Sequence, residues 1–236
     1  ADLQLGMPFE WAEKRSSEVE SRREDSIEAS GHVVDEHDAE FVVIAGDCFD
    51  DNTVESTTIV RGCERLAALE VPVYILPGNH DFGGGPDSVW RRREFLRHRP
   101  DNVTVLTERE PVVVGEDVVL LPAPLEQRHT AHDPTSHITA EFGRDDAGDA
   151  VRIAVAHGGV VDFDQGEGAN VIPTDRATSA DLDYMALGDW HGCKEVGPRM
   201  WYSGTPEPTN FKDNDQGNVL VVDIEDDQPT WVGRAS

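Results

Sequence analysis

Short apolar runs that end in polar turns organise the first third of the chain. Residues 41–45 (FVVIA) and residues 71–76 (VPVYIL) are such runs, and a glycine-containing polar turn follows each of them. A continuous apolar run of this length is typical of a strand buried on both faces. Residues 54–69, between the two runs, place apolar side chains at helical spacing. The succession of strand, helix and strand predicts a parallel crossover unit.

The remaining pattern alternates polar helices with closely spaced strands. Residues 10–38 predict a long solvent-facing helix, residues 89–99 a short arginine-rich helix, and residues 126–150 a long surface loop. Further apolar runs predict strands at 103–106, 112–114, 118–121, 153–156, 183–187 and 218–224. The whole pattern predicts an α/β fold, a two-layered mixed β-sheet sandwich flanked by helices.

Length and composition limit the class of protein. A chain of 236 residues can bury a substantial core, and its evenly spread apolar runs predict a single domain over residues 1–236. No stretch approaches the roughly 20 apolar residues of a membrane span, and no signal-peptide pattern opens the chain. We therefore expect a cytoplasmic protein with no membrane partner. The three cysteines have no CxxC spacing, which argues against disulfides and zinc knuckles.

The charge balance is strongly acidic, with 47 acidic residues against 20 lysines and arginines and a net charge of −27. Such a surface repels polyanions and slows their encounter with the protein at low salt. One explanation is adaptation to a salty, halophilic cytoplasm, where high ionic strength screens the self-repulsion. That explanation weakens any inference from the overall charge to the substrate.

Five polar clusters carry the candidate chemistry. Each cluster alone is most often a turn, a helix cap or a solvated histidine. Loops at the carboxyl ends of parallel strands converge on one crevice, so the ordered combination predicts a single site. Its carboxylate, amide and imidazole groups suit Mn, Fe, Zn or Mg. The clusters are Asp2-Leu3-Gln4, GDCFD at 46–50, GNHD at 78–81, His157-Gly158-Gly159 and Gly188-Asp189-Trp190-His191.

Asp2 differs from the other candidates because no apolar strand precedes it in the sequence. A functional Asp2 needs something to hold it in place. We expect that an N-terminal strand upstream of Ala1 is missing from this sequence, or that the terminus is anchored in an unconventional way.

The five clusters together resemble the motif set of the calcineurin-like metallophosphoesterases, which reads DxH, GDxxD, GNH(D/E), a histidine after a strand, and GHxH. Here the set reads DLQ, GDCFD, GNHD, VAHG and GDWH. The segments ADLQLG, AGDCFD, LPGNHD and YMALGDWHG, with YSGTP at 202–206, most resemble the nuclease subunits of double-strand-break repair. The resemblance covers nearly the whole chain. It implies the calcineurin-like fold and hydrolysis of phosphate esters, with DNA ends as a candidate substrate.

The resemblance also implies a centre of two divalent metal ions. Asp47 would bridge the ions, about 3.5 to 4 Å apart as in other two-metal hydrolases. Asp2 and His191 would bind the first ion, and Asn79 and His157 the second. His80 would lie beside the scissile phosphate as general acid or charge stabiliser, oriented by Asp50. The ions would activate water for attack and absorb the charge that develops on the phosphate oxygens.

Two positions depart from the family pattern. Gln4 stands where the family has a histidine ligand, and Asp189 stands where it has the first histidine of GHxH. A neutral amide oxygen is a weaker ligand for soft metals, and Asp189 adds an oxygen ligand with negative charge. Both changes favour oxygen-preferring ions, so we expect Mn(II) first, with Mg, Fe or Zn as alternatives and a weaker first site.

Three functions remain open from the sequence. The first is a phosphodiesterase of the exonuclease kind, although the chain leaves no room for a DNA-capping domain or ATPase-binding helices, so we do not expect an ATPase partner. The second is a phosphoesterase of nucleotides or other small molecules. The third is a metal-poor binding protein that lost turnover through Gln4 and Asp189.

Other polar residues have weaker claims. We expect His129, His132 and His137 to be solvated surface histidines. The arginines 91–93 could contact phosphate but more often form a solvated helix face. Trp190, between two candidate ligands, could stack on a base or simply pack.

Overall fold

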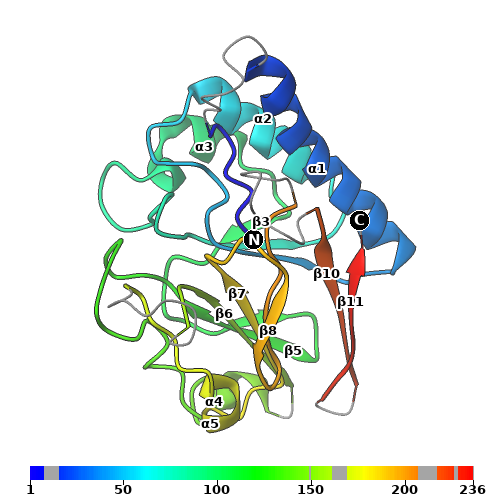
Figure 1. Ribbon diagram of the computed structural model, residues 1–236, viewed down its shortest axis with the longest axis vertical. Coiled ribbons are helices and arrows are strands. Elements are labelled where there is room, and N and C mark those ends of the chain that lie inside the picture. Colours follow the sequence, from blue (N-terminus) through cyan, green and yellow to red (C-terminus); the bar gives the residue numbers. More distant parts are fainter. Residues whose placement is uncertain (8–15, 149, 161–168, 207–216, 226–227, 236) are drawn as a thin grey trace.

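The structure, a computed structural model, consists of two β-sheets that face each other, with helices on both outer sides (Figure 1). The first sheet contains β1 (Val42–Ala45), β2 (Val73–Leu76) and β3 (Val103–Val105), paired in parallel in that order. The helices α1 (Ser16–Glu36), α2 (Ser56–Ala67) and α3 (Arg93–His98) cover its outer face. The structure describes residues 1–7, 16–148, 150–160, 169–206, 217–225 and 228–235.

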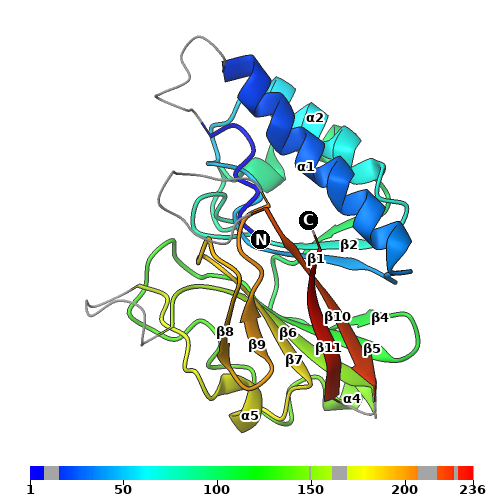
Figure 2. The same cartoon turned by 45° about the vertical axis from the view of Figure 1, so that its right-hand side comes forward.

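The second sheet has six strands in the order β4-β5-β6-β7-β9-β8. Its four central strands are parallel, and the outer strands β4 and β8 pair antiparallel to their neighbours. Two short helices, α4 (Arg144–Ala147) and α5 (Arg176–Ser179), lie at its far side (Figure 2). The strands are β4 (Val112–Val114), β5 (Val118–Ala123), β6 (Val151–His157), β7 (Tyr184–Gly188), β8 (Lys194–Gly197) and β9 (Met200–Tyr202).

The antiparallel hairpin of β10 (Val219–Glu225) and β11 (Gln228–Ala235) lies beside these sheets, opposite β1 (Figure 2). Val222 and Ile224 of this hairpin pack against the core between the two sheets. No described helix is both long and apolar enough to cross a membrane. Cys48, Cys63 and Cys193 are buried, and none of the three forms a disulfide bond.

The buried apolar residues form three separate cores, because side chains along each strand alternate between the two faces of its sheet. Ile44 and Ile75 point toward the helices and pack with α1 and α2, whereas Ala45 and Tyr74 point toward the second sheet. Successive side chains of a strand face opposite sides, so one apolar run fills two cores at once. The third core lies beneath the second sheet, where residues such as Ile138 pack against it. The predicted α/β sandwich flanked by helices is confirmed.

Several local predictions need correction. The long helix is not wholly solvent-facing, because Ile27 and Val34 are buried against the core. Residues 10–15 of the predicted span lie outside the described residues. The predicted surface loop 126–150 contains α4 and the fully buried Ile138. Residues 89–99 form a short 3-10 helix, Val89–Arg91, followed by α3. The strands β8, β9 and β11 and the helix α5 were not predicted.

Arg152 ties the second sheet to the segments beneath it. This β6 residue is 1% exposed, and its guanidinium donates to the carbonyl oxygens of Ala180 and Asp181 at 3.0 and 2.7 Å and of Thr139 and Phe142 at 3.0 and 2.8 Å. A planar fork of donors can satisfy four carbonyls in two segments at once. This contact explains how the polar segment 126–150 is held against the sheet.

We expect Arg152→Lys to lower the free energy of unfolding by about 2–4 kcal/mol, because an ammonium group cannot reach all four carbonyls and leaves buried acceptors unsatisfied. Urea denaturation at constant salt would measure the loss. The exposed Arg91→Lys is the matched control and should change stability by less than about 0.5 kcal/mol. Equal stability of both variants would contradict this role for Arg152.

Candidate metal centre

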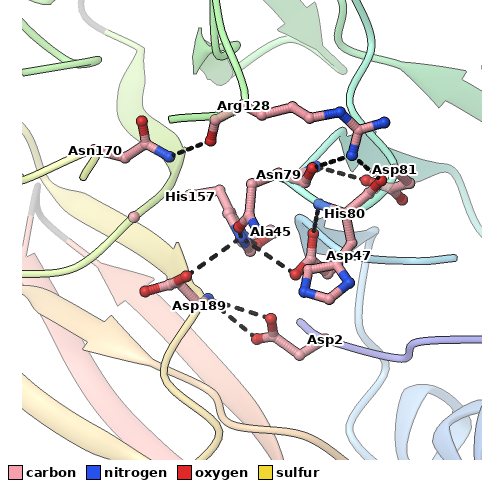
Figure 3. A network of polar contacts seen from close by, with 12 residues as sticks. Asp2, Ala45, Asp47, Asn79, His80, Asp81, Arg128, His157, Asn170 and Asp189 are labelled. Atoms are coloured by element: carbon pink, nitrogen blue, oxygen red, sulfur yellow. Dashed lines mark hydrogen bonds and ion pairs between the residues drawn. The ribbon is translucent and has the colours of Figure 1, made fainter. Parts of the chain in front are cut away.

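The candidate ligands meet where the carboxyl ends of strands from both sheets come together. Asp47 follows β1, Asn79 follows β2, His157 ends β6 and Asp189 follows β7 (Figure 3). Loops after parallel strands lie on the same edge of a sheet, and here the two sheets bring their edges to one place. Residues up to 187 positions apart in sequence therefore contact each other, as Asp2 and Asp189 do.

The imidazole of His157 lies at the centre of the cluster and is fully buried. Its Nδ1 lies 3.0 Å from the carbonyl oxygen of Ala45, which fixes the ring against the end of β1. Its Nε2 lies 2.9 Å from Oδ1 of Asn79, 3.5 Å from Oδ2 of Asp47 and 3.8 Å from Oδ1 of Asp189. One nitrogen therefore anchors the ring and the other faces three oxygen groups.

Asp2, Asp47 and His157 form a buried group whose ligand atoms all lie within 4.8 Å of one another. Asp2 is held by its backbone, whose N–H donates to the Gly46 carbonyl at 3.0 Å. Both of its carboxylate oxygens lie 3.3 Å from the backbone nitrogen of Asp189. The loop after β1 and the loop after β7 therefore anchor Asp2, which answers how this terminal residue is positioned.

Four candidate ligands adopt a left-handed backbone. The φ angles are 55° for Asp2, 46° for Gln4, 51° for Asp47 and 103° for Asp189. This conformation is uncommon for residues other than glycine, and such strain persists where surrounding contacts fix the geometry, often at functional sites. The strained turns aim short polar side chains into the cluster.

Two glycines allow the backbone to approach the cluster closely. A Cβ on Gly46, whose φ is +94°, would lie 1.9 Å from Nδ1 of His157, and a Cβ on Gly78 would lie 2.0 Å from Oδ1 of Asp47. Any side chain at either position would displace a candidate ligand. Steric crowding thus explains why the GDCFD and GNHD motifs begin with glycine.

The charges of the cluster depend on its burial. Burial raises the pKa of Asp2 to about 7, and the neighbouring Asp47 adds to this effect. Burial acts to raise the pKa of Asp47 as well, but His157 outweighs it and the pKa is lowered. Burial acts to lower the pKa of His157, yet the Asp47 carboxylate overcomes it and raises the pKa to about 10. A proton on His157 thus balances buried negative charge.

The residues present fit a divalent cation. Two buried carboxylates, an imidazole and the Asn79 amide oxygen offer the oxygen and nitrogen donors that Mn, Fe, Zn and Mg bind in proteins. Buried carboxylates are unfavourable without a compensating positive charge. A cation would replace the proton on His157 in that role, so Asp2, Asp47, Asn79 and His157 are suited to hold it.

His80 lies at the exposed side of the cluster, with 44% of its side chain accessible. Its backbone N–H donates to Oδ1 of Asp47 at 3.0 Å, and its Nδ1 lies 2.8 Å from the carbonyl oxygen of Asp50. The carboxylate of Asp50 is farther away, with Oδ1 at 3.9 Å from the same nitrogen. Orientation of the ring by Asp50 therefore comes first from its backbone carbonyl.

Two residues that hold this loop were not predicted from the sequence. The buried carboxylate of Asp81 accepts the N–H of Gly78 at 2.7 Å and that of Phe49 at 3.1 Å, and burial raises its pKa to about 7. Arg128 donates to the carbonyl oxygens of Asn79 and His80 at 2.8 and 2.9 Å. Asp81 belongs to the GNHD motif and could have been singled out, whereas nothing in the sequence around Arg128 indicates its contacts.

The remaining predicted site residues are placed less directly. Gln4 is buried, and its N–H donates to the carbonyl oxygen of Asp47 at 2.9 Å. His191 is half-buried, and its ring is not part of the buried group of Asp2, Asp47 and His157. Metal ligation by Gln4 and by His191 stays a prediction. Trp190 is 43% exposed, and stacking on a base stays a prediction.

The weaker candidates lie away from a shared site. His129 and His132 are exposed, as expected, but His137 is half-buried, bonds the Pro122 carbonyl at 3.0 Å and lies 5.2 Å from the ring of Phe142. The prediction of a solvated histidine is therefore wrong for His137. Arg92 donates to the Val54 carbonyl at 2.6 Å and serves the local fold, while the arginines at 91 and 93 are exposed.

The fold and the site together define a two-sheet α/β protein with a buried group of side chains suited to hold a divalent cation. Comparison with known families gives the assignment, because the pattern described as Calcineurin-like phosphoesterase matches residues 1–193. The chain belongs to this family.

One curated protein is similar to the chain in sequence, and one solved structure is similar to it in fold. The Bacillus subtilis (strain 168) protein YhaO, an uncharacterized metallophosphoesterase, is 31% identical to this chain over 119 aligned residues. The alignment covers 47% of this chain and 27% of that protein. The chain thus spans about a quarter of the length of this curated relative. The crystal structure of the Thermus thermophilus protein TT1561 has the same fold, with a TM-score of 0.53 and 11% identity over 89% of this chain and 92% of that one.

We expect manganese binding to release protons. A metal ligand must be deprotonated, whereas the pKa of Asp2 is raised to about 7 and that of His157 to about 10. At pH 6 both groups hold protons, so binding should release about two, and at pH 8 about one, because Asp2 has already ionised. Apparent affinity should therefore rise with pH. Calorimetry in two buffers of different ionisation enthalpy measures the number released, and zero at both pH values would contradict the assignment.

Proposed function

We propose that the chain is a phosphodiesterase that uses two divalent metal ions, manganese first, and that acts on DNA ends. The buried group of Asp2, Asp47 and His157, with Asn79 beside it, carries this proposal. When bound, the ions would supply Lewis acidity and a water activated for attack on phosphorus. The ligand atoms of Asp2, Asp47 and His157 all lie within 4.8 Å of one another, so Asp47 would be near enough to both candidate ligand sets to serve as their shared ligand.

The protein groups themselves would bind and orient the phosphate ester. His80 is fixed at Nδ1 by the Asp50 carbonyl, so its Nε2 faces away from that contact and is the atom suited to hold a proton for the leaving group. Arg128 and Asp47 fix the backbone on both sides of this histidine. A general acid held at both its ring and its backbone loses little orientation when a substrate arrives.

The ligand chemistry supports manganese over zinc. Gln4 offers a neutral amide oxygen and Asp189 a carboxylate at positions where the family has histidines. Asp189 Oδ1 lies 3.8 Å from Nε2 of His157, close enough to join the second ion's ligands after a small movement. A set rich in oxygen donors favours Mn(II) or Mg(II), because thiolate and imidazole sites favour softer metals.

Two observations support DNA as the substrate. The chain resembles repair nucleases in the segments ADLQLG, AGDCFD, LPGNHD and YMALGDWHG. The exposed Trp190, which follows Asp189 in the sequence, offers a surface on which a base could stack. The net charge of −27 favours a second candidate, a phosphoesterase of nucleotides or other small esters, because long polyanions are repelled more strongly than short ones.

A substrate panel with added manganese tests the proposal. We expect hydrolysis of bis(p-nitrophenyl) phosphate and release of nucleotides from the ends of linear duplex DNA. Asp47→Asn should lower both rates by about a hundredfold or more, or about 2.7 kcal/mol of barrier, because the bridging carboxylate is lost. Asp117→Asn is the matched control, since it removes an exposed carboxylate away from the cluster.

The outcomes separate the candidates. Cleavage of nucleotides without cleavage of DNA, in high salt as well as low, would favour the small-molecule phosphoesterase. Less than one manganese ion per chain and no hydrolysis of any ester would indicate the metal-poor binding protein and refute catalysis. Equal rates for Asp47→Asn and the unchanged chain would place the reaction elsewhere.

His80 has a test that depends on the leaving group. We expect His80→Asn to slow cleavage of DNA by about a hundredfold, because an alkoxide leaving group needs the proton. The same variant should affect bis(p-nitrophenyl) phosphate far less, since p-nitrophenolate leaves without protonation. His129→Asn, at an exposed histidine, is the control. A uniform loss on both substrates would assign His80 to binding rather than to proton transfer.

A further inference from the structure

Asn170 is a buried residue of the segment between β6 and β7, and none of the five polar clusters of the sequence includes it. Its side-chain amide bonds the loop that follows β5 (Figure 3). Nδ2 donates to the carbonyl oxygen of Arg128 at 2.9 Å, and Oδ1 accepts the N–H of Thr130 at 3.0 Å. Because one partner is an acceptor and the other is a donor, a side chain that carries both functions is required here.

The backbone of Asn170 also suits asparagine. Its φ angle is 57°, in the left-handed region where asparagine is found more often than most other residues. Its N–H donates to the carbonyl oxygen of Thr130 at 2.7 Å. The residue is therefore fixed to the loop after β5 through its main chain as well as through its side chain.

Asn170 packs directly against the turn that follows His157. A Cβ on Gly158 would lie 2.1 Å from the carbonyl oxygen of Asn170, so only glycine permits this approach. Further along the same segment, the N–H of Ile172 donates to the carbonyl oxygen of Gly159 at 2.8 Å. The two segments therefore lie side by side immediately after a candidate metal ligand.

Arg128 connects Asn170 to the loop after β2. Its Nη1 donates to the carbonyl oxygens of Asn79 and His80 at 2.8 and 2.9 Å. Its own carbonyl oxygen accepts the Asn170 amide, so this arginine is held at its backbone and at its guanidinium. Without the Asn170 amide, the backbone of Arg128 loses an anchor and the guanidinium can move away from both carbonyls.

These contacts close a circuit around two candidate ligands. On the inner side, Nε2 of His157 lies 2.9 Å from Oδ1 of Asn79. On the outer side, the path runs from Gly158 through Asn170 and Arg128 to the backbone of Asn79 (Figure 3). The loops after β2 and β6 are thus joined outside the cluster as well as within it. We call Asn170 and Arg128 the outer brace.

We propose that Asn170 is a positioning residue that acts through Arg128. It fixes the loop at 79–80 relative to His157, and so holds the amide oxygen of Asn79 and the ring of His80 in place. Its effect on metal binding rests on the proposed function. Removing a residue that orients metal ligands from outside costs about 10- to 100-fold in metal affinity.

The first test requires neither metal nor turnover. Asn170→Gly removes both side-chain hydrogen bonds, and glycine adopts the left-handed backbone without strain. In the metal-free chain we expect amide exchange of His80 to become about tenfold faster, because a looser loop releases its N–H from Asp47. The amide of Val155, at the centre of β6, exchanges by global unfolding and corrects for any loss of stability.

Asn102→Ala is the matched control. The Asn102 amide donates to the carbonyl oxygens of Leu66, Leu69 and Val71. It therefore also ties a loop together, but it lies at the amino-terminal ends of β2 and β3, opposite the cluster. Its removal should lower stability and leave the corrected exchange of His80 unchanged. Equal effects of the two variants on His80 would overturn the proposal.

A double-mutant cycle tests the route through Arg128. Arg128→Ala should also speed exchange of His80 by about tenfold. Once Arg128→Ala is present, Asn170→Gly should add less than about twofold, because both residues belong to one chain of contacts. Independent effects that multiply in the double variant would show that Asn170 acts by another route, and would overturn the proposal.

Manganese binding relates the outer brace to the proposed function. We expect Asn170→Gly to weaken the affinity measured by calorimetry by about tenfold, and Asn102→Ala to change it by less than about twofold. Faster exchange of His80 in a chain that binds no manganese would refute the proposed function and support the brace. Unchanged affinity of Asn170→Gly, in a chain that does bind manganese, would overturn the positioning role.

Discussion

The structure depends on burying two carboxylates beside one imidazole at the junction of two sheets. Asp2, Asp47 and His157 are each almost inaccessible to water, and a charge in such surroundings is unfavourable unless an opposite charge compensates it. In the protein alone, a proton on His157 supplies that compensation, and a divalent cation would supply more of it. The raised pKa values of Asp2 and His157 express the same physical demand that makes the site suited to a cation.

The sheets supply the rigidity that this arrangement requires. The Ala45 carbonyl at the end of β1 fixes the ring of His157 at the end of β6, so this hydrogen bond links the two sheets at the site itself. The carboxylate of Asp81 and the guanidinium of Arg128 then fix the loop that carries Asn79 and His80. Asp2 is held between the two sheets by hydrogen bonds with the Gly46 carbonyl and the Asp189 backbone N–H.

Much of the site could be predicted from local pattern. Apolar runs end at Ala45 and Leu76, and the polar residues that follow them, Asp47 and Asn79, do meet as parallel strands require. The role of Arg128 and the burial of His137 could not be predicted, because each depends on partners far away in sequence. The packing of segment 126–150 against the sheet could likewise not be predicted, because the residue that anchors it, Arg152, lies on β6.

The sequence by itself determined the alternation of buried strands and helices, the strand-end positions of the ligands and the family of the protein, because these follow from short-range periodicity and motif spacing. Only the tertiary structure decided which groups share the buried cluster and which backbone carbonyl orients His80. Those features arise where segments from different sheets approach each other, and neither hydrophobic periodicity nor spacing specifies such contacts.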